Sequence, residues 1–262
     1  MRPRDFLDHC SSMATWVDWT DTKDVVLHGD PDIQTDRVAV TWLATDAVLR
    51  EASKLGCSLV VSHEGAFYPA FQGTPSEDSH LAEKRRLMDE LGITLVRCHD
   101  TWDRMPDWGI CDRWAEYLGY PTEPRPLDSF YRICRIPGLA VEQVGEALMR
   151  KVRSLGQKAM SFIGRRDKII ERMAVGTGAI TRLPDMFELG ADLILATDDG
   201  IHSTYCGLWS LDLDVPVLVL NHATAELPGM MALADYIRET FDGIEAAYIP
   251  CGFPPPLIAE QT

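Results

Sequence analysis

The sequence has too few basic residues for a general nucleic-acid binder. It carries 25 Lys and Arg against 40 Asp and Glu, a formal net charge of −15, whereas binding a phosphate backbone requires clustered positive charge. It also has no long hydrophobic run, and the stretch 215–220 is far too short to cross a bilayer. The N-terminus reaches Asp5 without an apolar signal core. We therefore expect a cytoplasmic protein with neither nucleic-acid nor membrane partners.

Several chemical motifs are missing as well. The seven cysteines are scattered and form no C-x-x-C pair, which favours reduced thiols over a disulfide framework or a zinc ribbon. Cys98 adjoins His99, but neighbouring strand residues point to opposite faces, which argues against a nucleophile and its base. No G-x-S-x-G, P-loop or H-E-x-x-H motif occurs. Gly176-Thr177-Gly178 is too short for a dinucleotide fingerprint, and we interpret it as a tight turn.

What is present is a regular alternation of strands and helices. Apolar runs bounded by turn residues predict strands at 37–42, 59–62 and 93–98, with helices at 46–55 and 81–91 between them. Strand, helix and strand in this order normally give parallel strands joined by right-handed crossovers. The sequence therefore predicts an α/β fold. Further helices are expected within 1–20 and at 110–118 and 141–155, and the long connection 66–79 is typical of a lid over a site.

The second half of the chain repeats the pattern of the first. The segment 172–175 resembles 37–40, and 191–197 resembles 57–63. A third strand, predicted at 215–220, follows in the same order. An internal duplication explains the repeat, although α/β units also resemble one another in general.

The segment 121–127 is rich in proline and acidic residues, and we place the boundary between the repeats there. The predicted lobes are an N-terminal α/β lobe, 1–124, and a C-terminal α/β lobe, 125–262. They form either two domains or one compact unit.

Both third strands end in a histidine that is followed four residues later by a carboxylate. In α/β folds, ligands bind beyond the carboxyl ends of parallel strands. Imidazole and carboxylate without thiolate form the ligand mix of Zn, Mn, Fe and Ni sites. The simpler alternative is local hydrogen bonding within loops. The polar residues at the predicted strand ends are His63, Glu64, His99 and Asp103 in the first half, and Thr197, Asp198, Asp199, His202, His222 and Glu226 in the second.

The residues after 220 predict a helix with Thr224 as its N-cap. Pro228 then lies in the first turn, where no N–H partner is required, and His222 lies just outside the helix.

At these positions the chain resembles the Nif-three-like dinuclear metal proteins, often labelled type 2 GTP cyclohydrolase I. The resemblance rests on the segment 38–64, which ends in L-V-V-S-H-E, and on H-D-T-W-D at 99–103, G-A-D-L-I-L-A-T at 190–197 and N-H-A-T-A-E at 221–226. The motifs occur in the order typical of that family.

The resemblance implies two pseudo-repeated α/β lobes with a metal site in the cleft between them, in a ring-shaped homo-hexamer. Two divalent metal ions would be held there. The chain departs from the family pattern at Glu64, where His-His is usual, and at Asp198-Asp199, where Gly-Glu is usual. Carried over by position, the metal ligands are His63, Glu64, Asp103, His222 and Glu226, while His99, Asp199 and His202 line the same cleft and Thr197 supports it.

The first functional hypothesis is a metal-dependent hydrolase. Two divalent ions would share a water molecule and lower its pKa, and the hydroxide would attack an electrophilic carbon or phosphorus while His99 or His202 moves a proton. A purine-like ring C–N bond, a phosphoester and an amide of a small molecule all suit this chemistry. The alternative is a non-catalytic metal-binding or protein-interaction scaffold. A thiol enzyme based on Cys98 is the least favoured hypothesis.

Overall fold

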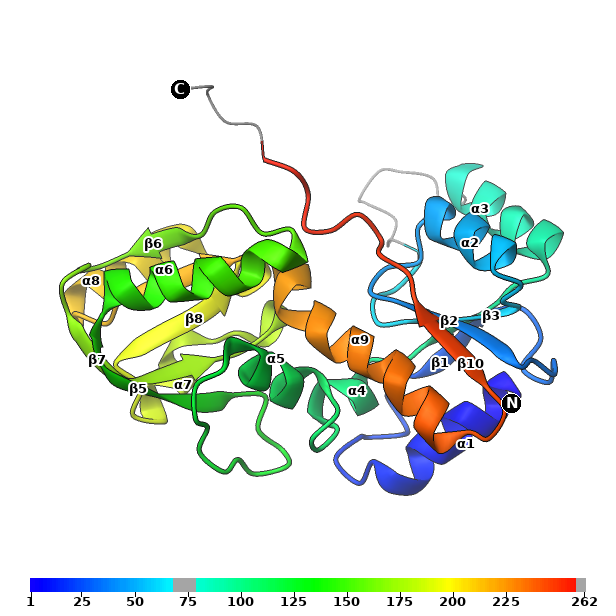
Figure 1. The fold of residues 1–262 in the computed structure, drawn as a ribbon, viewed down its shortest axis with the longest axis horizontal. Helices are drawn as coiled ribbons and strands as arrows, with labels where there is room; N and C mark the ends of the chain where they lie inside the picture. Colours follow the sequence, from blue (N-terminus) through cyan, green and yellow to red (C-terminus); the bar gives the residue numbers. More distant parts are fainter. Residues whose placement is uncertain (68–78, 258–262) are drawn as a thin grey trace. The chain divides into compact units, whose positions relative to one another are not determined.

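Two five-stranded sheets organise the part of the chain that the computed structural model describes, residues 1–67 and 79–257 (Figure 1). Each sheet is the centre of one compact unit. The first unit comprises Met1–Trp108 and Met230–Cys251, and the second comprises Gly109–Gly229 and Gly252–Thr262.

The first unit is built on a mostly parallel sheet of strand order β1-β4-β3-β2-β10. Only β1 runs antiparallel to its neighbour within this sheet. The three strands in the middle are almost entirely buried, which explains their apolar sequences. The strand bounds are β1 Val25–His28, β2 Arg37–Thr41, β3 Leu59–Ser62, β4 Thr94–Arg97 and β10 Glu245–Tyr248.

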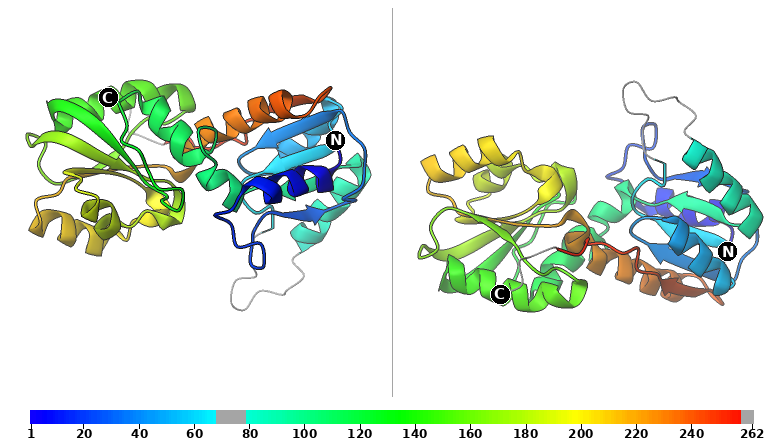
Figure 2. Two further views of the ribbon diagram at one scale, coloured as in Figure 1. Left: turned by 90° about the horizontal axis from the view of Figure 1, so that it is seen from below. Right: turned by 90° about the horizontal axis from the view of Figure 1, so that it is seen from above.

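Helices cover both faces of this sheet (Figure 2). On one face, Leu49 of α2 and Met88 of α3 pack in a core cluster with Val60 of β3. On the other face lie α1 and the end of α9. The ring of Phe6 in α1 lies 6.3 Å from that of Phe241, the residue that follows α9. The helices of this unit are α1 Pro3–Met13, α2 Asp46–Lys54, α3 Ser79–Leu91, α4 Asp100–Arg104 and the C-terminal part of α9 His222–Thr240.

The second unit contains a sheet of order β5-β7-β8-β9-β6, with β5 and β6 antiparallel at its edges. Helix α6 covers one face, and α7 and α8 cover the other (Figure 2). The strands are β5 Arg132–Ala140, β6 Ser161–Ile163, β7 Ile169–Val175, β8 Leu193–Thr197 and β9 Val217–Leu220. The helices are α5 Ile110–Leu118, α6 Val141–Val152, α7 Leu183–Glu188 and α8 Ser203–Asp212, with short 3-10 turns η1 Arg153–Leu155, η2 Gly178–Ile180 and η3 Asp198–Gly200.

The predicted duplication is visible in the topology. Elements β2-α2-β3-α3-β4 in the first unit and β7-α7-β8-α8-β9 in the second have the same order along the chain and the same parallel pairing. The two-lobed α/β fold is therefore confirmed. The edge strands β5, β6 and β10 were not predicted, because their sequences are short, partly exposed or interrupted by proline.

The compact units divide the chain at other positions than the predicted boundary at 124/125. Strand β10 pairs with β2 and so joins the first sheet. Helix α5 joins the second unit, because its Asp112 accepts hydrogen bonds from Arg125 Nε at 2.9 Å and from Arg132 at 3.0 Å. The proline-rich segment 121–127 is thus fastened to α5 by a largely buried ion pair.

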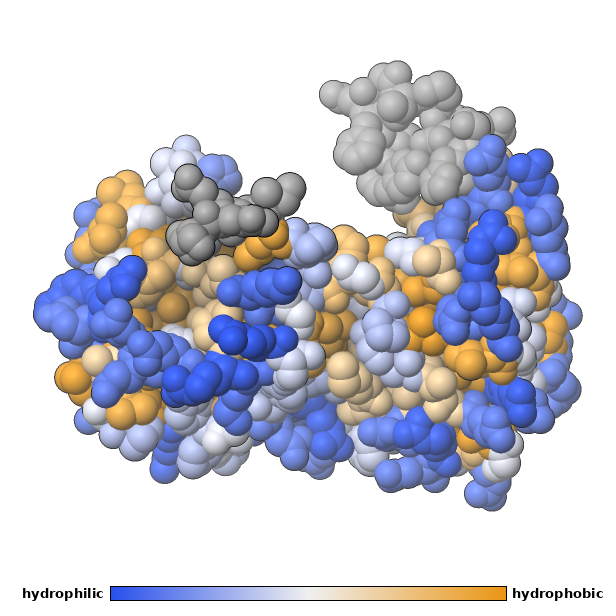
Figure 3. Space-filling model, turned by 45° about the horizontal axis from the view of Figure 1, so that its top comes forward, coloured by the Kyte–Doolittle hydropathy of each residue, from blue (hydrophilic) through white to orange (hydrophobic). Residues whose placement is uncertain are grey.

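Two further predictions concern membrane partners and a lid over the site. The described part of the chain contains no helix both long and apolar enough to cross a membrane. On the face drawn in Figure 3, hydrophilic side chains cover much of the surface and apolar residues form separate patches among them. Most of the connection 66–79, predicted as a lid, lies outside the described residues.

Two helix glycines provide a matched test of the packing in the second unit. A Cβ on Gly229 of α9 would lie 2.8 Å from the Ile110 Cα, whereas a Cβ on Gly207 of α8 would meet nothing within 4 Å. We expect Gly229→Ala to lower the free energy of unfolding by about 1–3 kcal/mol, since the clash outweighs the better helix propensity of alanine. Gly207→Ala should raise it by about 0.5–1 kcal/mol. Urea unfolding followed by circular dichroism measures both, and equal shifts in the two variants would contradict the packing described.

Candidate functional site

His63 follows the buried strand β3 directly and is itself fully buried. Its Nδ1 lies 3.2 Å from the Cys98 carbonyl oxygen, and a carbonyl can only accept, so Nδ1 carries the proton. The other ring nitrogen, Nε2, lies 3.4 Å from Oδ1 of Asp103. If His63 is neutral, its Nε2 carries a lone pair, and this lone pair faces the carboxylate of Asp103. Two acceptors at that distance require a proton or a cation between them.

His99 directly precedes the short helix α4, which follows β4, and Asp103 lies within that helix. The His99 ring stacks on that of His63, with centroids 4.4 Å apart and an angle of 9° between the planes. Its Nδ1 is 3.0 Å from Asp100 Oδ1 and 3.3 Å from Asp103 Oδ2. His63, His99 and Asp103 each offer a ligand atom, and these atoms lie within 4.8 Å of one another. We call these three residues the first cluster.

The buried carboxylate of Asp24 holds α4 in place. It accepts hydrogen bonds from the backbone N–H groups of His99, Asp100 and Thr101, the last two at 2.9 and 2.8 Å. These are N–H groups at the start of a helix, which otherwise lack intrahelical partners. Sequence reasoning missed Asp24, because its relation to His99 exists only through the antiparallel pairing of β1 with β4.

Asp100 is fixed as an anion beside His99. Burial would raise the pKa of its carboxyl group, but the hydrogen bonds from His99 and from the Lys23 N–H outweigh that effect and hold the pKa well below its ordinary value. An ionised carboxylate at Nδ1 orients the His99 ring, as partners of metal-binding histidines do.

Glu64, the predicted ligand next to His63, forms an ion pair with Arg97 of β4. Its Oε2 lies 3.1 Å from an Arg97 guanidinium nitrogen. The pairing was not predicted, because it depends on the register of β3 against β4.

His222 and Glu226 meet at the start of α9, together with Asp199. His222 Nε2 is 2.8 Å from Glu226 Oε1, and its Nδ1 is 2.7 Å from Asp199 Oδ2. Glu226 and His222 are buried, and Asp199 is exposed. We call His222, Glu226 and Asp199 the second cluster. The predicted contact between His222 and Glu226 is thus present, and it again sets an imidazole nitrogen against a buried carboxylate.

The predicted start of this helix is wrong. Helix α9 begins at His222 rather than after Thr224, because Asp198 from η3 accepts the His222 N–H at 2.8 Å and so caps the helix. Thr224 instead donates its hydroxyl to Gln157 at 2.7 Å. Pro228 consequently lies inside the helix, where it removes the N–H that would bond to the Thr224 carbonyl.

The turn at 176–178 passes directly against the second cluster. Gly178 has a φ of +59°, and a Cβ there would lie 2.9 Å from His222 Nε2 and 3.3 Å from Glu226 Oε1. Thr197 holds this turn by donating its buried hydroxyl to the Gly178 carbonyl at 2.9 Å. The missing side chain therefore keeps space open beside the two possible ligand atoms.

Among the described residues, no hydrogen bond or ion pair joins His202 to the second cluster. It precedes α8, is exposed, and lies against Tyr205 with ring centroids 4.9 Å apart. Its role in proton transfer therefore stays a prediction. The two clusters belong to different units, and the expectation of one shared site in a cleft also stays a prediction.

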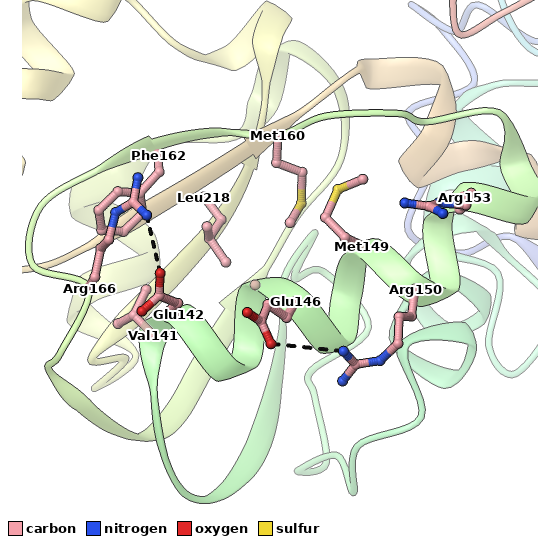
Figure 4. Close-up of a pocket in the computed structure, with 11 residues that line it drawn as sticks. Val141, Glu142, Glu146, Met149, Arg150, Arg153, Met160, Phe162, Arg166 and Leu218 are labelled. Atoms are coloured by element: carbon pink, nitrogen blue, oxygen red, sulfur yellow. Dashed lines mark hydrogen bonds and ion pairs between the residues drawn. The ribbon is translucent and has the colours of Figure 1, made fainter. Parts of the chain in front are cut away.

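A separate cavity of about 500 Å³ opens between α6 and β6 in the second unit (Figure 4). Met149, Met160 and Phe162 form apolar walls, and the Glu142–Arg166 ion pair, 3.2 Å long, crosses its rim. No residue predicted to bind metal or substrate lines it. Sequence periodicity identifies only the buried face of α6, so this cavity was not predicted.

Fold and site together define a class: a duplicated α/β protein in which each half places histidine and carboxylate groups at the ends of its parallel strands, with groups that could bind a metal ion. The chain belongs to the Duf34/NIF3 (NGG1p interacting factor 3) family, whose model matches residues 4–251. The family predicted from the sequence motifs is thereby confirmed.

Individual relatives agree with this assignment. A Clostridium perfringens protein named GTP cyclohydrolase 1 type 2 homolog is 25% identical over 222 residues, which cover 82% of each chain. A Bacillus cereus protein related to NIF3 has a TM-score of 0.81 at 12% identity, over 99% of both chains. Staphylococcus aureus protein SA1388 has a TM-score of 0.80 at 16% identity, also over 99% of both chains. At these identities the two structures support the fold alone.

The space beside Gly178 can be tested with a matched glycine. Gly178→Ala should weaken the binding of Mn²⁺ by about tenfold or more, because its Cβ would crowd His222 Nε2 and Glu226 Oε1. Gly138→Ala, at a φ of +65° with no atom within 4 Å of the new Cβ, carries the same backbone strain without that contact. Isothermal titration of the metal-free proteins with Mn²⁺ compares them. Equal affinities in the two variants would show that the space beside Gly178 has no part in binding.

Cys98 should be inert towards alkylation. A hydrogen bond with Cys10 and complete burial raise the pKa of its thiol, so it stays protonated at pH 8. We expect iodoacetamide to modify the partly exposed Cys206 and Cys251 of the folded protein first, as measured by peptide mass spectrometry. Preferential labelling of Cys98 would revive the thiol-enzyme hypothesis.

Proposed function

We propose that this chain binds two divalent metal ions through the two clusters and uses them to hydrolyse a small molecule. One observation carries the proposal. His63 Nε2 and Asp103 Oδ1 face each other at 3.4 Å in a buried position, while His63 Nδ1 donates a hydrogen bond to a backbone carbonyl. A cation between these atoms satisfies both. His222 and Glu226 repeat the arrangement at 2.8 Å.

The residues present fit divalent transition metals. His63 and Asp103 would serve as ligands in the first cluster, with His99 either as a third ligand or as a proton carrier, and His222 and Glu226 would serve in the second. Imidazole nitrogen and carboxylate oxygen without thiolate suit Zn, Mn, Fe or Ni. The Cys98 carbonyl and the Asp199 carboxylate each engage the Nδ1 of a histidine, which directs the other ring nitrogen towards the ligand position.

Hydrolysis requires an activated water molecule and a group that transfers a proton. A bound divalent ion lowers the pKa of water and polarises the substrate. His99 is the best-placed proton carrier, since its ring is partly accessible and its Nδ1 is held by Asp100. It therefore either binds metal or transfers protons, and variants at His99 separate these roles: loss of metal indicates the first, and loss of activity with metal retained indicates the second.

Substrate selection begins from the relatives. The Clostridium perfringens protein is named as a homolog of a GTP cyclohydrolase, so a ring C–N bond of a purine-like heterocycle is the first substrate class to test. Phosphoesters and amides are the others, because a metal-activated water can attack phosphorus as well as a carbonyl carbon.

A second candidate function is protein interaction in a homo-oligomer, which the family resemblance suggests is a hexamer. The observation that favours it is the surface of α8, where Tyr205, Leu208 and Leu211 are 70%, 59% and 65% exposed. Large apolar side chains that share one helical face often mark protein contacts. In this function the metal ions are structural.

Metal analysis of purified variants tests the proposal. His63→Ala and His222→Ala should each lose at least one metal ion per chain and most of any hydrolase activity, since each removes an imidazole ligand. His28→Ala is the control, because His28 also pairs with a carboxylate, Asp89 at 2.7 Å, but lies outside both clusters. Elemental analysis by plasma mass spectrometry and assays with purine nucleotides, phosphoesters and amides provide the measurements.

Full metal content in both histidine variants would contradict the metal sites. Full metal loading of the wild type without turnover, together with loss of assembly in Leu208→Asp, would favour the second function instead.

A further inference from the structure

Arg97 is an unusual residue for its position. It ends β4, whose other residues, Thr94, Leu95 and Val96, are buried. In the parallel register of β3 and β4 it lies opposite Ser62, which places it beside the residues that follow β3. A charged side chain here needs partners, and the structure supplies two on consecutive residues.

Both partners of Arg97 belong to the end of β3. Its Nε donates to the His63 carbonyl at 3.0 Å, and a terminal guanidinium nitrogen donates to Glu64 Oε2 at 3.1 Å. The side chains of Arg97 and Glu64 are 18% and 23% exposed, so solvent screens this pair less than one on the surface. The hydrogen bond from Nε to the His63 carbonyl fixes the orientation of the planar guanidinium. In this orientation a terminal nitrogen can donate to Glu64.

We propose that Arg97 is a positioning residue that retains Glu64 as its counter-ion and keeps it out of the metal ligands. Glu64 also offers a ligand atom within 4.8 Å of one on His63, so its carboxylate would be within reach of an ion without Arg97. With Arg97 in place, the first cluster binds its ion through its own three residues. This inference rests on the proposed function and revises the ligand set predicted from the sequence.

Electrostatics supports the revised set. A carboxylate that already neutralises a guanidinium is a weaker ligand than an unpaired one, and a fixed positive charge beside a divalent ion repels it. Three protein ligands with positions left for water and substrate are what a catalytic ion needs. The negative charge of Glu64 is thus offset by an arginine from the neighbouring strand.

A double-mutant cycle tests the pairing. The variants are Arg97→Met, Glu64→Gln and the double variant, and the probe is Mn²⁺ titrated calorimetrically into the metal-free full-length protein. Arg97→Met should bind Mn²⁺ about tenfold or more tightly, because a nearby cation is removed and Glu64 is released. The double variant, in which the charged pair becomes a neutral one, should bind within about twofold of wild type. Arg97→Lys keeps the charge and should also stay near wild type.

Each outcome of the double-mutant cycle either supports or overturns the inference that Glu64 is not a metal ligand. If the double variant loses about tenfold in affinity or one ion per chain, Glu64 is a ligand and the inference is wrong. Unchanged affinity in Arg97→Met would equally overturn it, and if that variant does not fold, the double variant decides alone. His63→Ala belongs in the same series: retention of metal there would refute the proposed function, whereas loss of metal only in the double variant would refute this inference and leave the proposed function intact.

Discussion

The parallel pairing of three consecutive strands in each unit is the constraint on which the candidate site depends. Parallel strands end at one edge of a sheet, so the residues that follow β3 and β4 must be neighbours. His63, His99 and Asp103 come together for this reason and not through their spacing in the sequence. The same pairing of β8 with β9 brings η3, with Asp198 and Asp199, to the start of α9.

Two carboxylates, the buried Asp24 and the exposed Asp198, then fix the helices beside the histidines. Asp24 and Asp198 accept backbone N–H groups at the starts of α4 and α9, and neither belongs to the helix it caps. A buried N–H without a partner costs about 1–3 kcal/mol, so these caps determine where each helix begins. Both halves thus reach the same arrangement with caps that come from different places in the topology.

Much of the fold could be predicted, because the buried strands are nearly continuous apolar runs and the turns carry glycine. The clustering of histidine with carboxylate at strand ends was also predictable. The contacts that turn these residues into a site were not: Asp24 with α4, Arg97 with Glu64 and Gly178 with His222 each join distant segments whose register the sequence does not reveal. The start of α9 was misplaced for the same reason, since Asp198 supplies a cap that local sequence cannot indicate.

The first cluster is assembled from two separate parts of the chain, around residues 63 and 99–103, and Asp24 from a third part holds the second of these in place. In an unfolded chain these parts are apart, so a metal ion would find its ligands only in the native state. Binding would therefore be coupled to folding, and an ion present at 100 times its dissociation constant would add about 2.7 kcal/mol to the stability of the native state. Depletion of metal in the cell would then lower the amount of folded protein as well as any activity it has.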